Sequence, residues 1–158
     1  MSPLYARAPI GERAVCRRPA ARGSNISVVG ALHAGGVIAF DARDGAYDGE
    51  RFLMFLENKL IPKLRKGDIV FMDNVRFHKV DGIRESIEAT GAELHYLPPY
   101  SPEMNPIEEV WSFFKNLMRK AAARNVPKLV DALMSAMVAV TREIAGAFFT
   151  HAGYAQFT

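Results

Sequence analysis

The amino-acid sequence predicts an α/β domain in which helices flank a mixed β-sheet. Short apolar runs bounded by glycine or proline alternate with longer segments whose apolar residues recur at helical spacing. A tight glycine-containing turn separates the first two apolar runs, whereas a helical segment separates the later two. We therefore expect one antiparallel hairpin and one parallel strand–helix–strand unit.

The first half of the chain predicts a hairpin and a helix. Residues 25–33 (NISVVGALH) have the composition of a strand, the sequence AGG turns the chain, and residues 37–40 (VIAF) return it. An amphipathic helix follows over residues 49–64. Its apolar residues recur every three or four positions: Phe52, Phe55, Leu56, Leu60 and Leu64.

The middle of the chain predicts a strand, a short helix and a second strand. Residues 69–72 (IVFM) form an apolar run that ends at Asp73. Asp81 is expected to cap a short helix that stops near Gly91. Residues 92–98 form the next predicted strand, because the prolines at 98 and 99 end it.

The last third of the chain is predicted to be helical. One helix begins after Asn105, and a second covers about residues 126–147. The first carries one continuous apolar stripe: Ile107, Val110, Trp111, Phe114, Leu117 and Met118. The second carries Leu129, Leu133, Met137 and Val138, a face more typical of core packing or an oligomer contact than of a ligand site.

Size and composition indicate one globular domain over residues 1–158, with its core at about 5–122. Apolar residues make up 49% of the 158 residues and charged residues 23%, which argues against a disordered chain. No apolar run approaches the roughly 18 residues of a membrane span, and the N-terminus lacks a signal-peptide block. Cys16, the one cysteine, excludes an internal disulfide. We expect a cytoplasmic protein without membrane contact.

The net charge of +3 is unevenly distributed. Two basic clusters could neutralise nucleic-acid phosphates. On charge alone, scattered or solvated cations are the more economical interpretation. The clusters are Arg7, Arg13, Arg17, Arg18 and Arg22 near the N-terminus, and Lys115, Arg119, Lys120, Arg124 and Lys128 in the helical part.

Asp73 is the first candidate for a functional residue. Ligand sites of α/β sheets gather at the carboxyl ends of strands, where the following loop opens a crevice. Asp73 directly follows the apolar run at 69–72, and Asn74 beside it could fix its orientation. An aspartate that simply ends a strand in a turn is the alternative.

Glu108 is the second candidate. The sequence NPIE places Asn105 at the N-cap of a helix, Pro106 at its first position and Glu108 where its carboxylate can reach back to the cap. Capping alone would explain Glu108. On a helical wheel, Glu108 lies on the flank of the apolar stripe and Glu109 closer to solvent, so Glu108 is the better candidate for a site beside the sheet.

Together, Asp73 and Glu108 offer the hard oxygen ligands that Mg²⁺ prefers. Two such ions about 4 Å apart can activate water and stabilise the leaving oxygen in phosphodiester cleavage. The presence of both acids therefore supports a metal-ligand role for each of them more strongly than either acid does alone.

The sequence DNVRFHK, followed by LPPYSPEMNPIEEVW, resembles the catalytic domain of insertion-sequence transposases in the bacterial branch of the Tc/mariner superfamily. Thirty-four residues lie between Asp73 and Glu108, as in that branch. The resemblance extends upstream to LYARAPIGERA and covers most of the chain to about residue 120. It implies an RNase H-like fold and DDE chemistry, in which paired Mg²⁺ or Mn²⁺ ions cut DNA at the element's ends and a freed 3′ end joins target DNA.

By this resemblance, Asp73 is the second acid of the triad and Glu108 the third, both as metal ligands. His78 and Lys79 would then lie beside the active site or contact DNA, as would Asn74 and Asn105. The implied partners are DNA and, in the active state, further copies of the protein. A bacterial, nucleoid-associated location follows from the same resemblance.

One departure from the family pattern affects the expected activity. Only three residues precede the LYARAPIGER segment, so we expect the first strand, the first acid and the DNA-binding region to be missing. Asp41, Asp44 and Asp48 belong to the wrong strand and its loop. The chain is thus interpreted as a C-terminal catalytic fragment, nearly inactive unless an upstream half is supplied. The alternatives are a DNA- or partner-binding remnant and an RNase H-like nuclease unrelated to transposition.

Overall fold

The computed structural model describes residues 9–10, 26–121 and 126–155, with the backbone alone for 118–121 and 126–130. The predicted hairpin is confirmed: β1 (Ile26–His33) pairs antiparallel with β2 (Gly36–Asp44). Strand β2 is longer than the predicted 37–40. Gly36 follows the turn with φ of +124°, a backbone conformation that glycine adopts without strain.

The helix predicted over residues 49–64 is present as one helical segment of changing pitch. It begins as α1 (Gly49–Phe55), where the side chain of Asp48 accepts the backbone N–H of Arg51. It continues as a wider π turn, η1 (Leu56–Leu60), and ends as a tight 3₁₀ turn, η2 (Ile61–Lys63).

The strand–helix–strand unit is also confirmed. Strands β3 (Ile69–Met72) and β4 (Glu93–Tyr96) pair in parallel, and the 3₁₀ turn η3 (Arg76–Lys79) and α2 (Ile83–Glu88) connect them. The prediction that Asp81 caps this helix was wrong. Gly82 occupies the cap with φ of +92°, and no side chain caps the helix there.

A 3₁₀ turn, η4 (Pro102–Met104), precedes α3 (Pro106–Ala121). The prediction of one helix over about 126–147 was wrong, because the chain forms α4 (Val126–Val138) and α5 (Arg142–His151). Thr141 has extended backbone angles, and its hydroxyl oxygen accepts the N–H of Ile144, which starts a new helix. No single described helix is long and apolar enough to cross a membrane; part of α4 and α5 qualify only as a pair bent by 78°.

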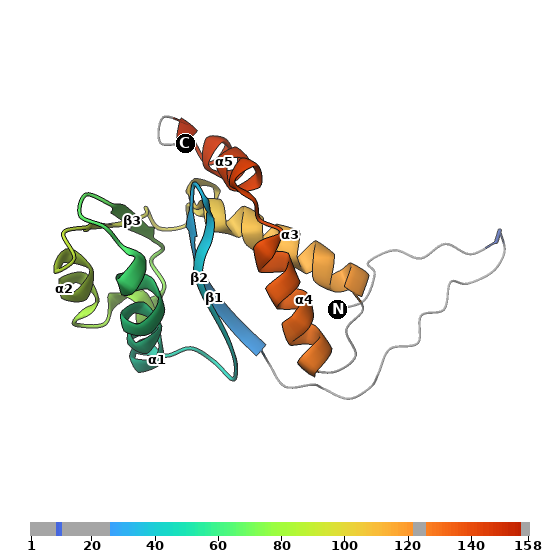
Figure 1. Cartoon of the computed structure of the whole chain (residues 1–158), viewed down its shortest axis with the longest axis horizontal. Coiled ribbons are helices and arrows are strands. Elements are labelled where there is room, and N and C mark those ends of the chain that lie inside the picture. The colour runs from blue at the N-terminus through green and yellow to red at the C-terminus, as the bar shows by residue number, and fades with distance from the viewer. Residues whose placement is uncertain (1–8, 11–25, 122–125, 156–158) are drawn as a thin grey trace.

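The predicted α/β class is confirmed, but the strands of the described residues do not form one mixed sheet. They form two separate two-stranded sheets, β1–β2 and β3–β4. Figure 1 shows the hairpin standing between α1 on one side and the α3–α4 pair on the other, with β3 and α2 on the same side as α1. No described strand lies between β1 and β3 to join the two pairs by hydrogen bonds.

The hairpin separates two apolar cores because side chains alternate between the faces of a strand. Val29 and Ala39 pack with the fully buried Leu56 in the cluster formed by α1, α2 and the second sheet. Val28 and Phe40 pack on the opposite face, against Val110, Phe114 and Met137 of the helical layer. Both faces of the hairpin are therefore covered.

Candidate catalytic site

Asp73 lies at the carboxyl end of β3, and its side chain is 38% exposed. One carboxylate oxygen, Oδ1, lies 2.6 Å from His78 Nδ1 and accepts the backbone N–H of Val75 at 3.2 Å. Among the described residues, no hydrogen bond reaches Oδ2. The hydrogen bond with His78 lowers the pKa of Asp73 against the opposing effect of burial. The carboxylate is therefore ionised at neutral pH, with one oxygen held and the other available to a cation.

His78 is held in place by its ring contacts on the turn η3. Its ring lies 4.2 Å from the Phe52 ring and 4.5 Å from the Phe77 ring, centre to centre. An ionised carboxylate only accepts hydrogen bonds, so Nδ1 carries the proton that Asp73 shares. The second ring nitrogen, Nε2, is buried, and no hydrogen-bond partner for it exists in the described part of the chain.

The other residues that the sequence placed near Asp73 have structural contacts of their own. The Asn74 amide donates to the carbonyl of Leu97, so it ties the loop after β3 to the loop after β4 rather than orienting Asp73. Lys79 is exposed, with its ammonium 5.6 Å from the ring centre of Tyr96. Sequence reasoning missed Tyr96, whose hydroxyl donates to the His78 carbonyl at 2.6 Å; no local pattern marks a contact between residues eighteen positions apart.

Glu108 and Asn105 lie at the start of α3. Asn105 has extended angles and precedes the first helical residue, and its carbonyl accepts the Glu108 N–H at 3.0 Å. The wheel estimate for the two glutamates was wrong. Glu108 is exposed, whereas Glu109 is half-buried, with its carboxylate 3.4 Å from His151 Nε2. Helix α5 packs along α3 and covers the face that the wheel assigned to solvent.

Neither Asp73 nor Glu108 is among the residues that line the groove of about 450 Å³, but residues beside each of them are. Met72, which precedes Asp73, lines this groove, and so does Ile107, which precedes Glu108. His78 and Asn105 line it as well. No group of three or more acidic, histidine or cysteine side chains positioned for a metal exists in the part of the chain that the structure describes.

None of the three aspartates upstream of Asp73 in the hairpin region supplies a third metal ligand beside Asp73 and Glu108. Asp41 accepts hydrogen bonds from Lys59, Tyr47 and Arg43, so its oxygens are already used. Asp48 caps α1. Asp44 is exposed at the end of β2.

Residues of the N-terminal basic cluster lie outside the described residues. In the second cluster, only Lys115 has a described side chain, and it is exposed.

Comparison with solved structures shows the fold. The Mos1 strand transfer complex matches with a TM-score of 0.74 and 17% identity, covering 95% of this chain and 46% of that one. The Mos1 transposase paired-end complex with the left transposon end matches with the same TM-score and 16% identity, covering 99% and 48%. The catalytic domain of Mos1 mariner transposase matches with a TM-score of 0.66 and 17% identity, covering 78% and 66%.

This chain thus has the RNase H-like fold of the Mos1 catalytic domain, and it spans about half the length of the longer Mos1 chains. No curated protein matches it in sequence. The family model for the DDE superfamily endonucleases matches residues 1–130, which include Asp73, His78 and Glu108. The chain belongs to the DDE superfamily endonucleases, in agreement with the Tc/mariner-like resemblance of its two motifs.

Proposed function

We propose that this chain is the catalytic portion of a bacterial insertion-sequence transposase, which cuts DNA at the ends of its element and joins them to target DNA. The main support for this proposal is the ionisation and hydrogen bonding of the Asp73 carboxylate. Its carboxylate is ionised, held through Oδ1 by His78 and Val75, and free of hydrogen bonds to described residues at Oδ2. The Val75 bond is one that a turn-forming aspartate also makes, whereas the contact with His78 is not needed to end a strand.

Asp73 and Glu108 fit a divalent cation in part. Both offer hard carboxylate oxygens, as Mg²⁺ and Mn²⁺ require, and each follows a residue that lines the groove. His78 would fix the orientation of Asp73. Mos1 catalytic domain structures with raltegravir contain Mg in one case and Mn in another. Bound ions would supply charge stabilisation at the phosphate and activation of water. Because two carboxylates are a small set for two ions, a third acid from elsewhere would complete the site.

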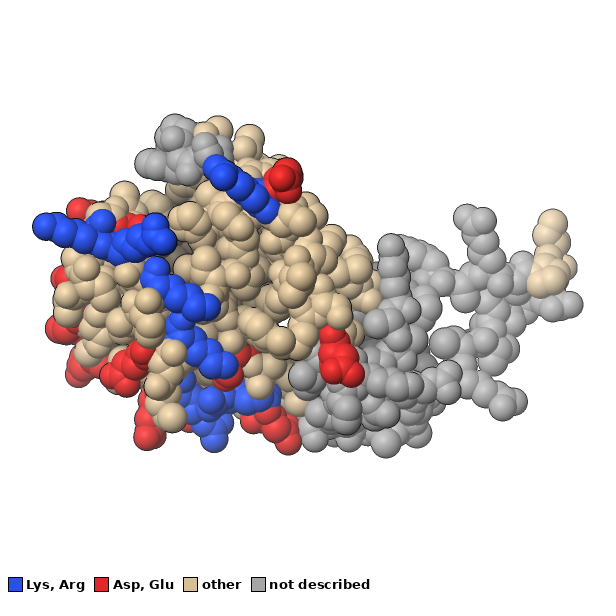
Figure 2. Space-filling model, viewed as in Figure 1, with Lys and Arg blue, Asp and Glu red and all other residues tan. Residues whose placement is uncertain are grey.

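The proposed substrate is DNA, as in the Mos1 complexes. Arg76 and Lys79 are exposed on the turn that follows Asp73, where they could contact phosphates beside the cleaved bond. Figure 2 shows a band of lysine and arginine side chains over α1 and the adjoining edge of β2. We propose this band as a second phosphate contact. A homo-oligomer and a nucleoid location in the bacterial cytoplasm complete the proposal.

The test is metal-dependent nicking of DNA that carries the repeats flanking the coding frame. The chain is assayed alone and with a polypeptide supplied that contains the upstream part of the transposase. We expect weak or no nicking alone and nicking with both parts, in Mg²⁺ or Mn²⁺ and not in EDTA. Asp73→Asn and Glu108→Gln should abolish it.

Glu109→Gln and Asp44→Asn are the matched controls, because each removes a neighbouring carboxylate outside the proposed ligand set. Equal loss of nicking in Glu108→Gln and Glu109→Gln would contradict the assignment. Robust nicking by the chain alone, abolished by Asp73→Asn, would refute the expected inactivity of the isolated chain.

A second function, binding of DNA or of a partner transposase without catalysis, is favoured by one observation: the described residues hold no group of three metal ligands. Salt-dependent DNA binding with no cleavage under any metal, even with the upstream part present, would support it. Cleavage of branched or hybrid substrates in preference to element ends would instead indicate an RNase H-like nuclease.

A further inference from the structure

We propose that the ring of Tyr100 stacks on one unpaired base of the DNA strand that enters the candidate catalytic site. The inference rests on the proposed function for its ligand, DNA, and deepens it by naming the form that the site takes: a strand with a base outside the duplex. The contact itself is inferred from the exposure, the backbone conformation and the position of Tyr100.

Tyr100 lies wholly in solvent. It is 101% exposed, and its side chain has no hydrogen bond, ion pair or ring contact with any residue that the structure describes. Phe71 is the other exposed phenylalanine, tyrosine or tryptophan among the described residues, and its ring lies 5.1 Å from the Tyr154 ring, centre to centre. Aromatic side chains stabilise a fold through buried area and ring contacts. Tyr100 has neither within the described chain, so its ring is available to a ligand.

The backbone of Tyr100 is strained. Its φ is +59°, and no other non-glycine residue among those described has a positive φ. The left-handed region costs free energy for a residue that has a Cβ atom, and residues held there concentrate at active sites and ligand contacts. Pro99 and Pro102 restrict the backbone on either side. Neither the ring nor the backbone of Tyr100 stabilises the folded chain, which favours a role in binding.

The loop that carries Tyr100 begins beside Asp73. Leu97 opens this loop: its N–H donates to the Met72 carbonyl at 2.8 Å, and its carbonyl accepts the Asn74 amide. Met72 and Asn74 are the two neighbours of Asp73 in sequence. Tyr100 follows Leu97 by three residues, so their Cα atoms lie at most about 11 Å apart.

The same loop ends at the helix that carries Glu108. After the 3₁₀ turn η4, the carbonyl of Asn105 accepts the N–H of Glu108 at 3.0 Å. Tyr100 thus lies on the segment that joins the two proposed metal ligands. A DNA strand with a phosphate in the candidate site would carry its neighbouring bases past this ring.

Two cations lie on the turn next to this loop. Arg76 and Lys79 are exposed on η3. The Lys79 ammonium lies 5.6 Å from the ring centre of Tyr96, and the Tyr96 hydroxyl donates to the carbonyl of His78 at 2.6 Å. These contacts fix η3 to the strand that leads into the Tyr100 loop. Proteins bind single-stranded nucleic acid with this combination, in which cations track the phosphates and an exposed ring stacks on a base.

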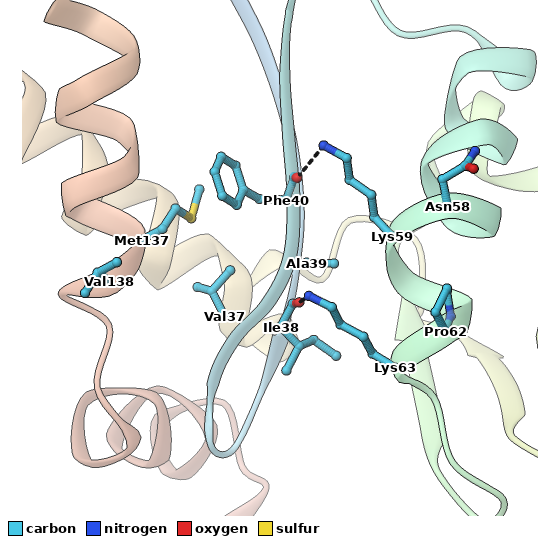
Figure 3. A pocket seen from close by; sticks show the side chains of 10 residues that line it. All are labelled: Val37, Ile38, Ala39, Phe40, Asn58, Lys59, Pro62, Lys63, Met137 and Val138. Carbon is cyan, nitrogen blue, oxygen red and sulfur yellow. Dashed lines mark hydrogen bonds between the residues drawn. The ribbon is translucent and has the colours of Figure 1, made fainter.

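A cationic cavity at the outer edge of β2 lacks such a ring. Figure 3 shows Lys59 and Lys63 reaching from the helical segment to the carbonyls of Phe40 and Ile38. The two lysines cover this strand edge against pairing with another chain and border a cavity of about 420 Å³. The half-buried Phe40 side chain packs against the core of the helical layer. The cavity therefore offers cations for phosphates but no exposed ring for a base.

The test measures the binding of DNA that contains an unpaired base. The probe is a short duplex with a single-stranded thymidine tail, in which 2-aminopurine is the first unpaired base. Stacking lowers the fluorescence of this base, and the anisotropy of a dye at the duplex end gives the affinity, in EDTA so that no strand is cut. We expect the parent chain to quench the probe. Tyr100→Gly should bind it about 5- to 150-fold more weakly, because glycine adopts a positive φ without strain and removes only the ring.

Three comparisons separate stacking from other contacts. Tyr100→Phe retains the ring and should bind like the parent. Met104→Ala, at another exposed apolar residue of the same loop (38%), should leave the affinity unchanged. With an abasic site in place of 2-aminopurine, the parent and Tyr100→Gly should bind equally, because no base is present to stack.

Equal affinity of the parent and Tyr100→Gly for the probe would overturn the proposal, as would an undiminished difference between them on abasic DNA. Weaker binding by Tyr100→Phe would also contradict stacking, because it would assign the contact to the hydroxyl. A lower mass of Tyr100→Gly in light scattering, with no dependence of binding on the base, would overturn it in favour of a contact with a second copy of the chain. Because the assay contains neither metal nor a cleavage step, its failure is separate from any failure of the nicking test.

Discussion

Replacing Asp41 with alanine should destabilise the chain strongly, because this side chain fastens the hairpin to the helical segment. Its side chain is 17% exposed. It accepts the Tyr47 hydroxyl at 2.5 Å, Lys59 Nζ at 2.7 Å and Arg43 Nε at 3.2 Å. The substitution removes the acceptor and leaves three donors without it.

The three bonds differ in expected contribution. A hydrogen bond from a hydroxyl to a carboxylate contributes about 1.5–3 kcal/mol, and the Tyr47 bond is the most sheltered of the three. Lys59 is 46% exposed, so solvent screening reduces its ion pair to about 0.2–1 kcal/mol. The Arg43 guanidinium is in contact with solvent, and its pair adds little to this sum. We expect a total loss of about 2–4 kcal/mol in the free energy of unfolding.

Urea unfolding measures this loss, with Trp111 as the probe. Trp111 is the only tryptophan and packs in the core on the opposite face of the hairpin, so its fluorescence reports unfolding of the whole layer. The matched control is Asp44→Ala, an exposed residue on the same strand, for which we expect a change within about 0.5 kcal/mol. Equal losses in the two variants would refute the assignment of Asp41 to a structural network.

Four further predictions follow from particular contacts. Burial alone would raise the pKa of Asp41, but its hydrogen bonds lower this pKa below the ordinary 3.8. The stability that Asp41 confers should therefore be complete above pH 3.8 and fall as the pH drops through the lower pKa of the folded state. Acid unfolding of Asp41→Asn compared with the parent chain measures this dependence. Leu56→Ala, at a fully buried site, should cost about 2–5 kcal/mol in urea unfolding, and a cost below that of an exposed alanine variant would contradict the core assignment. His78→Gln should weaken Mn²⁺ binding about 10- to 100-fold in an EPR titration by releasing Asp73 Oδ1, whereas an unchanged affinity would exclude the orienting role. The double variant Lys59→Met, Lys63→Met uncovers the β2 edge and should increase the apparent mass in light scattering with concentration; a mass equal to that of the parent at every concentration would show that the lysines do not guard the edge.

Elements with strong periodicity or clear punctuation were predictable from the sequence. The run at 69–72 became β3 with the predicted bounds, and Val110 and Phe114 of the predicted stripe are buried. These features depend on the local alternation of apolar and polar residues, which a sequence displays directly.

Features that depend on contacts between distant segments were not predictable. Glu109 is half-buried because α5 covers it. The sequence pattern did not predict α5 as a separate helix, because the break at Thr141 lies within the longer helix predicted there. The division into two sheets likewise depends on which strands can pair in space. At the site, the sequence predicted Asp73 and Glu108 from motif and spacing, but the bond from His78 to Asp73 and the unpartnered Nε2 required the position of the His78 ring against Phe52.

The most direct test of the proposed site is whether Asp73 and Glu108 share one divalent ion. Mn²⁺ is added in small amounts to the isotopically labelled chain, and the paramagnetic broadening of each backbone amide is measured by NMR. We predict that the amides of Asn74 and Glu109 broaden together at the same low Mn²⁺ concentration, and that Asp73→Asn removes both effects. Broadening at only one of them, or equal broadening at Asp44, would contradict a common ion site.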